Sequence, residues 1–245
     1  MVVKRGLLPA ISTALALVIA AAAPALGAFR ASEPDPLMQQ SLLRVQDMVT
    51  AGKTADYGPV VAVGWRQGTK PGELMGPLGI AIDRSGDIYV ADSGNNRIVK
   101  YSTGGVAKKA WGKQGMGRGE LVYPTAVAVN SQNEIVVVDR VHVQRFPPEG
   151  EVVAAWGKGG TGDGELNRPL GLAVDAQNYI YVADTGNNRV QKFDLNGRFV
   201  AKWGSAGTGD GQMMGPVSVA VNNKGNIFVL ELENNRLQEF KVPAQ

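Results

Sequence analysis

The sequence predicts an all-β protein, a four-bladed β-propeller. Two observations predict this fold: a sequence repeat with a period in the mid-forties, and short β-rich runs between turn residues within each repeat. The period is marked by Trp-Gly pairs 46, 45 and 47 residues apart and by prolines 47, 45 and 47 residues apart. The tryptophans are Trp65, Trp111, Trp156 and Trp203, and the prolines are Pro77, Pro124, Pro169 and Pro216.

The clearest repeat, residues 79–112, predicts the four strands of one blade. An apolar run ends at Asp83, a second run covers 88–90, a third covers 98–101, and a fourth ends at Trp111. Gly, Asp, Asn and Ser separate these runs, as expected for turns between strands. One small sheet cannot bury both of its faces, so the repeats are expected to stack around an axis. The regularly placed tryptophans are then expected to wedge between neighbouring blades rather than to bind sugars.

The two ends of the repeat region predict how the ring closes. Residues 59–65 match the last strand of a repeat, and residues 216–242 match the first three strands. Joining them would complete the fourth blade, with the N-terminal strand closing the ring. The alternative is an arc that closes only by pairing with another chain.

Residues 1–27 are predicted to be a signal peptide or signal anchor. Lys4 and Arg5 give a positive start, residues 7–23 are uncharged and rich in Ala and Leu, and small residues near Gly27 suit cleavage. A cleaved signal is favoured, because a membrane span needs about 20 apolar residues and this run is at the short end. The repeats are therefore expected outside the cytoplasm, periplasmic or secreted, or held at the membrane by residues 7–23 if the signal is retained.

Residues 28–58 are predicted to be a connector with a short helix, and residues 59–245 to be the propeller. Asp35 and Pro36 suit a helix start, and an apolar stripe follows over 37–49. This helix is expected to pack on the propeller. A docking helix for a partner is the alternative.

Composition excludes several function classes. The chain has no cysteine, so neither a disulfide framework nor a Cys-based zinc site is expected. Its 25 Lys and Arg against 22 Asp and Glu give a net charge of +3, and cleavage after residue 27 would leave 23 against 22, or +1. This balance and the expected export argue against a nucleic-acid partner.

The segments 92–97 and 184–189, the strands like 79–83 and the Trp-Gly strand ends resemble the NHL-repeat family, over about residues 60–242. The resemblance implies a β-propeller, although NHL propellers more often have six blades. It also implies possible relatives among lyases and lactone hydrolases, of which the amidating lyase uses metal-bound histidines. This chain has one histidine, His142, which cannot form a multi-histidine zinc site and is expected to lie exposed in a loop.

Long loops join the fourth strand of one repeat to the first strand of the next. Because strand directions alternate, these loops share one face with the loops between the second and third strands; we call it the long-loop face. Long loops on a rigid scaffold commonly carry binding sites, so this is the candidate recognition surface. Its long loops are 66–75, 113–123, 158–168 and 205–214. Its candidate binding residues are Arg66, Lys70, Lys113, Arg118, Tyr123, Asp163, Arg168 and Asp210.

An acidic residue follows the second strand of each repeat. These residues are expected to accept backbone hydrogen bonds and to pair with an arginine, while a cation held by a ring of oxygens is the alternative. The second repeat lacks two residues here, and Arg140-Val141-His142 stands where the others have Asn-Asn-Arg. The loop residues with this structural role are Asp92, Arg97, Asp139, Asp184, Arg189, Glu231 and Arg236.

The sequence thus favours an exported, non-enzymatic protein-binding or scaffold module that uses the long-loop face. An envelope or extracellular protein is the expected partner, with membrane association only if the N-terminal segment is retained. No cofactor is predicted, and a structural cation is the alternative. The alternative is a metal-dependent hydrolase or lyase of a small molecule or glycan, with its site at the central channel. Polysaccharide binding ranks last, because Tyr123 is the only clear aromatic candidate in the long loops.

Overall fold

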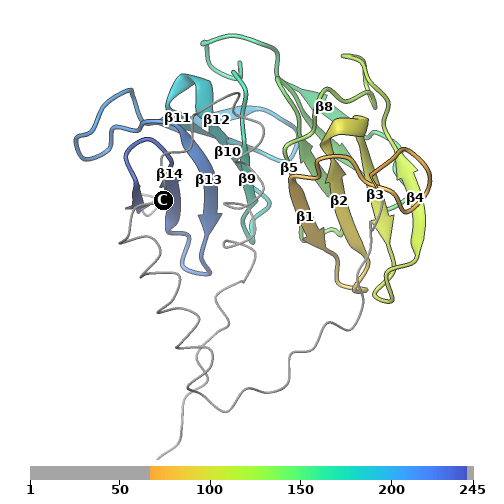
Figure 1. Cartoon of the computed structure of the whole chain (residues 1–245). Helices are drawn as coiled ribbons and strands as arrows, with labels where there is room; N and C mark the ends of the chain where they lie inside the picture. The colour runs from red at the N-terminus through yellow and green to blue at the C-terminus, as the bar shows by residue number, and fades with distance from the viewer. Residues whose placement is uncertain (1–66, 242–245) are drawn as a thin grey trace, which may run out of the picture.

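The structure, a computed structural model, describes residues 67–241 and is built from four antiparallel β-sheets (Figure 1). The predicted signal segment, the connector helix and the closing strand 59–65 lie outside the described residues. No helix within residues 67–241 is long and apolar enough to cross a membrane.

Each sheet corresponds to one sequence repeat. The first contains β1 (Gly79–Ile82), β2 (Ile88–Asp92), β3 (Arg97–Tyr101) and β4 (Ala107–Trp111). The second contains β5 (Ala126–Val129), β6 (Ile135–Val138), β7 (Val143–Phe146) and β8 (Ala154–Trp156). The third contains β9 (Gly171–Val174), β10 (Ile180–Asp184), β11 (Arg189–Phe193) and β12 (Phe199–Trp203). The fourth contains β13 (Pro216–Val221), β14 (Ile227–Glu231) and β15 (Arg236–Phe240).

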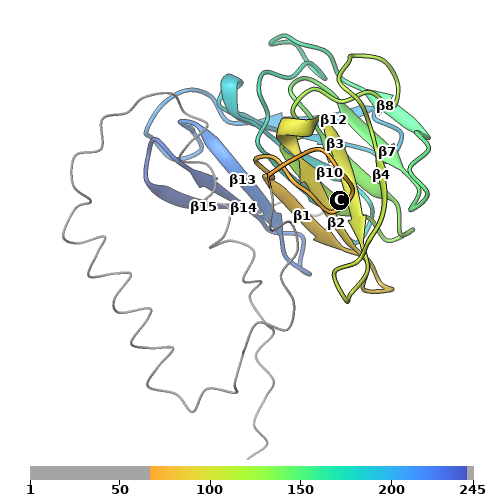
Figure 2. The same ribbon diagram turned by 45° about the vertical axis from the view of Figure 1, so that its right-hand side comes forward.

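The sheets follow one another in chain order, in contact through their first strands. β1 packs beside β5, β5 beside β9, and β9 beside β13. The first strands therefore lie on the inner side of an arc, and the first and fourth sheets lie at its two ends (Figures 1 and 2). Within residues 67–241, no contact of similar extent joins β13 to β1. The fold is thus all-β and propeller-like, as the sequence predicts.

Apolar clusters fill the spaces between consecutive sheets. Between the first and second sheets, Tyr89, Ile98 and Trp111 pack against Val127 and Phe146. Equivalent clusters lie between the second and third sheets and between the third and fourth. Within residues 67–241, the second and third sheets therefore pack on a neighbour at both faces, and the first and fourth sheets at one face each.

Each described tryptophan lies between two sheets and contacts an aromatic ring of the next repeat. The ring centroids are 6.1 Å apart for Trp111 and Phe146, 6.2 Å for Trp156 and Phe193, and 6.1 Å for Trp203 and Phe240. This packing is the wedge between blades that the regular spacing predicts. The aromatic area removed from water makes these contacts a main source of cohesion between repeats.

Tight Asx turns close the face opposite the long loops. Asp83 Oδ1 accepts hydrogen bonds from the backbone N–H groups of Ser85 and Asp87, at 2.8 and 2.9 Å. Asn130, Asp175 and Asn222 make the same pair of bonds in the other repeats. These polar side chains are used within their own turns, which favours the long-loop face as the functional one.

Candidate functional site

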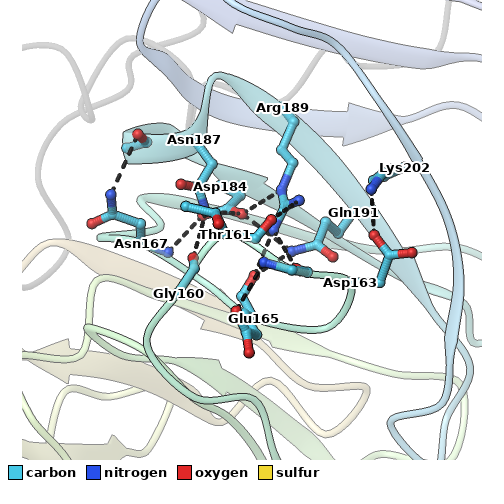
Figure 3. A network of polar contacts seen from close by, with 12 residues as sticks. Gly160, Thr161, Asp163, Glu165, Asn167, Asp184, Asn187, Arg189, Gln191 and Lys202 are labelled. Carbon is cyan, nitrogen blue, oxygen red and sulfur yellow. Dashed lines mark hydrogen bonds and ion pairs between the residues drawn. The ribbon is translucent and has the colours of Figure 1, made fainter.

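A network of polar contacts connects each long loop to the end of the second strand of the repeat that the loop enters. In the third repeat, Arg189 Nε donates to Asp184 Oδ2 at 2.7 Å (Figure 3). The same guanidinium donates to the carbonyl oxygens of Thr161, Gly162 and Glu165, each at 2.8 Å. A single arginine therefore satisfies a buried carboxylate and fixes the path of a long loop.

Amide side chains complete the same network. Asn187 Nδ2 donates to Asp184 Oδ2 at 2.8 Å and to the Gly160 carbonyl at 2.9 Å. Gln191 Nε2 donates to the Glu165 carbonyl at 2.6 Å (Figure 3). Asn187 lies in a short 3₁₀ turn, Thr185–Asn187, directly after β10. The segment 184–189 thus fixes both its own turn and the path of the long loop 158–168.

The first and fourth repeats contain the same arrangement. Arg97 Nε lies 2.7 Å from Asp92 Oδ2, and Arg236 Nε lies 2.8 Å from Glu231 Oε1. The acidic side chains are fully buried in both pairs. Burial alone would raise the pKa of Glu231, but hydrogen bonds from Arg236 and from neighbouring donors lower it below its ordinary value.

The second repeat has no arginine at this position, and its turn is built differently. Asp139 Oδ1 accepts from the backbone N–H groups of Val141 and His142, and Oδ2 accepts from that of Val122. The prediction that His142 lies exposed is wrong. Its side chain is 16% exposed and its Nδ1 lies 3.5 Å from Asp139 Oδ1, because the shorter turn folds the imidazole back against the carboxylate.

Two glutamates stiffen the long loops from within. Glu120 Oε2 accepts from the Gly117 N–H at 2.9 Å, and Glu165 makes the same bond to Gly162 at 2.8 Å. These backbone bonds, together with nearby lysines, hold the pKa of both glutamates below the ordinary value. The loops are therefore internally bonded structures on which outward side chains can be presented.

A cavity of about 600 Å³ opens on the long-loop face, at the point where the four repeats converge. Each repeat contributes the residue after its marker proline, the regularly spaced proline at 77, 124, 169 or 216. These residues are Leu78, Thr125, Leu170 and Val217. Because one equivalent residue from every sheet lines it, we call this the axial cavity. Its other lining residues are Tyr123, Arg140, Arg168, Pro169, Thr185, Gly186, Asn188, Gly215, Leu232 and Glu233.

The predicted binding residues divide into two groups. Tyr123 and Arg168 line the axial cavity. Lys70, Lys113, Arg118, Asp163 and Asp210 do not line it and lie exposed on the long loops. Arg66 lies outside the described residues.

Several residues of the exposed group contact their own blade. Lys113 pairs with Glu120 at 3.1 Å, Arg118 donates to the Val153 carbonyl at 3.2 Å, and Asp163 pairs with Lys202 of β12. We call Lys70, Lys113, Arg118, Asp163 and Asp210, which lie exposed and do not line the axial cavity, the rim of the face.

Sequence reasoning missed the cavity residues Arg140 and Glu233. Arg140 is visible as a departure of the second repeat, but a departure alone does not reveal which space it faces. Within residues 67–241, no three His, Cys, Asp or Glu side chains are grouped closely enough to hold a metal ion. The acidic loop residues are instead engaged in the turn networks described above.

A family model matches individual repeats of the chain. A family model described as the NHL repeat matches residues 74–101, 166–193 and 213–240. These stretches contain the first three strands of the first, third and fourth repeats. Three of its four repeats are NHL repeats. No curated protein matches it.

Solved structures share the arrangement of these NHL repeats. A structure of streptogramin B lyase matches with a TM-score of 0.51 and 16% identity, over 69% of this chain and 56% of that chain. Virginiamycin B lyase from Staphylococcus aureus matches with a TM-score of 0.51 and 14% identity, over 69% and 57%. A protein of unknown function from Bacteroides thetaiotaomicron matches with a TM-score of 0.54 and 16% identity, over 66% and 46%. The chain spans little more than half the length of the lyases, and at these identities the likeness concerns the fold.

Proposed function

We propose that this NHL-repeat chain is a binding module whose recognition surface is the long-loop face, and that its partner is an envelope or extracellular protein. The observation that carries the proposal is a difference between the backbones and the side chains of the long loops. Their backbones are fixed by internal networks, while Tyr123 and Arg168 line the axial cavity and the rim residues lie exposed. A pre-organised loop surface loses little conformational entropy on binding, which favours recognition.

We further propose that residues 59–65 add a fourth strand to the last sheet and so complete a four-bladed propeller. β15 has no fourth-strand partner within residues 67–241, unlike β3, β7 and β11. The loop that follows residue 66 forms a Gln67–Leu74 bridge, equivalent to the bridges in the other three long loops. Its geometry therefore suits a preceding blade, as in every other repeat.

Exposed residues on β1 support the same proposal. Ile80 and Ile82 are 50% and 61% exposed, whereas their equivalents in the second repeat, Val127 and Val129, pack against the preceding sheet. A completed neighbour would cover this apolar edge, with a second copy of the chain as the alternative cover. We also propose that residues 1–27 are a signal segment and that the repeats lie outside the cytoplasm.

A second candidate function is that of a lyase or hydrolase, which the similarity in fold to streptogramin B lyases suggests. One of the matching structures is a catalytically inactive histidine-to-alanine variant of the Staphylococcus aureus lyase with quinupristin. The single histidine here, His142, packs against Asp139 and does not line the axial cavity. Its position favours the binding module over histidine-based catalysis.

Native mass spectrometry of the full chain, purified gently from its own cells, tests the proposal. We expect a complex with a second polypeptide, and we expect the double variant Arg118→Glu and Arg168→Glu to lose it. Arg84→Glu with Arg198→Glu is a matched control, because both arginines are exposed at the ends of strands on the opposite face. Equal loss in both variants, or in neither, would contradict this choice of face. A bare protein carrying one equivalent of metal would favour the enzyme.

A further inference from the structure

Two arginines of the axial cavity have guanidinium groups without a partner among residues 67–241. Neither Arg140 nor Arg168 makes a side-chain hydrogen bond or an ion pair there. The Arg168 backbone N–H donates to the Arg140 carbonyl at 3.2 Å, so the two residues are neighbours across adjacent repeats. This contrasts with Arg97, Arg189 and Arg236, whose guanidinium groups are each saturated by a carboxylate and loop carbonyls.

Arg168 and Tyr123 occupy a backbone conformation that suits glycine. The residue before the marker proline has a φ of +53° at Tyr123 and +47° at Arg168. The equivalent residues of the first and fourth repeats are Gly76 and Gly215, with φ of +51° and +58°. A bulky residue is disfavoured there by its Cβ and by the following proline. Strain of this kind is characteristic of functional positions, and here it places two large side chains at the cavity.

Arg140 occupies a position at which two other repeats have a hydroxyl residue that forms a hydrogen bond to the next repeat. Ser93 and Thr185 occupy the equivalent position, and their hydroxyls donate to the Pro124 and Pro216 carbonyls at 2.6 and 2.7 Å. In the second repeat Thr125 takes over, with its hydroxyl 2.8 Å from the Pro169 carbonyl. The bond between repeats is thus preserved, and position 140 is free to present a cation to the cavity.

The remaining lining defines the ligand. Leu78, Leu170, Val217 and Leu232 provide apolar walls, and Leu232 stands 48% exposed. Two arginines and Glu233 give the cavity a formal charge of +1, which balances a singly charged anion. A phosphate group, at about −1.5 to −2, would leave excess negative charge in a largely apolar space.

We propose that the axial cavity binds a monocarboxylate with an apolar body, its carboxylate held by Arg140 and Arg168 and its apolar part by the leucines and Tyr123. Paired N–H donors of arginine match the two oxygens of a carboxylate. The inference rests on the proposed binding role of the long-loop face and names the group recognised at its centre. Such a carboxylate is supplied either by a small organic acid or by the C-terminus of a peptide.

Ligand-observed NMR on the full chain tests the chemistry with matched probes. The small-molecule arm compares 3-phenylpropionate with 3-phenylpropionamide, and the peptide arm compares acetyl-Ala-Ala-Phe with its C-terminal amide. We expect each carboxylate to bind at least about tenfold more tightly than its amide, the effect of losing a charge-assisted hydrogen bond. The tighter of the two carboxylates identifies the source. Equal binding of acid and amide, or tighter binding of inorganic phosphate, would overturn the proposal.

Variants locate the site. Arg140→Gln and Arg168→Gly should each weaken carboxylate binding about tenfold or more, and Arg168→Gly reproduces the glycine of two other repeats. Arg84→Gln on the opposite face should leave it unchanged, and thermal melts confirm that each variant is folded. A loss shared by Arg84→Gln would overturn the proposal. Failure of partner capture with intact carboxylate binding would instead count against the protein-binding function alone.

Discussion

Arg189 and Asp184 form a buried ion pair, 2.7 Å from Nε to Oδ2, that also fixes a long loop. The carboxylate is fully buried and the arginine side chain is 7% exposed. Arg97 with Asp92 and Arg236 with Glu231 repeat the relationship at the same spacing of five residues. These pairs connect the strand ends of a repeat to the loop that enters it.

Removal of Arg189 should be among the most damaging single changes in the loops. Arg189→Ala leaves the Asp184 carboxylate buried without its cation, which should cost about 3–5 kcal/mol of unfolding free energy. Lys202→Ala removes the exposed pair with Asp163 and should cost at most about 1 kcal/mol. Urea unfolding of both variants checks the contrast. Similar losses would mean that the buried network does not stabilise the repeat.

Trp111 should contribute strongly to cohesion between the first two sheets. It is 9% exposed and packs against Tyr89 and Phe146. Trp111→Ala should therefore lower the free energy of unfolding by about 3–5 kcal/mol, as large-to-small core changes do. Val106→Ala is the control, because Val106 is 67% exposed and should change stability by about 0.5 kcal/mol or less. A mild Trp111→Ala variant would contradict the wedge role.

Gly150 should be intolerant of a side chain because it lies on the Trp111 ring. A Cβ at Gly150 would stand 2.6 Å from Trp111 Cδ2, and its φ is +85°. Gly225 has a nearly equal φ of +82° with no heavy atom within 4 Å of such a Cβ. Gly225→Ala should thus cost about 1 kcal/mol from backbone strain, and Gly150→Ala about 1–3 kcal/mol more from overpacking. Thermal and urea unfolding of the pair isolate the clash, which equal losses would refute.

The glycine-like positions of the cavity predict opposite signs for opposite substitutions. Arg168→Gly relieves a left-handed backbone and should leave stability unchanged or raise it by about 1 kcal/mol. Gly76→Ala imposes that strain where a Cβ meets nothing within 4 Å, and should cost about 1 kcal/mol. Urea unfolding measures both. A large loss in Arg168→Gly would show that its side chain serves stability instead of binding.

Acid should weaken the fourth repeat through Glu231. The donors around this carboxylate lower its folded-state pKa, so its stabilisation is present above the unfolded pKa of about 4.3 and is lost as pH falls through the lower folded value. Wild-type unfolding free energy should therefore decline more steeply below about pH 4.5 than that of Glu231→Gln, which cannot titrate. Urea titrations between pH 7 and 3 compare the slopes. Parallel curves would contradict the linkage.

Much of the fold was predictable because each blade is formed by one continuous stretch of the sequence. Hydrogen bonds within a blade join strands that are close in the chain, so turn residues and alternating runs are enough to predict the four-stranded unit and its loops. The tryptophan wedge was predictable for the same reason, since a fixed spacing places each ring at the same boundary between sheets.

The centre of the long-loop face was only partly predictable. Tyr123 and Arg168 were named from the loops, but Arg140 and Glu233 belong to turns after second strands, and no local pattern links them to the same space. The prediction for His142 failed because a two-residue deletion changed the turn that carries it.

The sequence by itself determined the repeat unit, its turns, its ion pairs and the residues that separate one blade from the next. Tertiary structure alone decided which side chains meet at the axial cavity, because that depends on how successive sheets are rotated against one another. This rotation arises from packing between repeats some 45 to 47 residues apart, and residues with unrelated local roles thereby come to line one cavity.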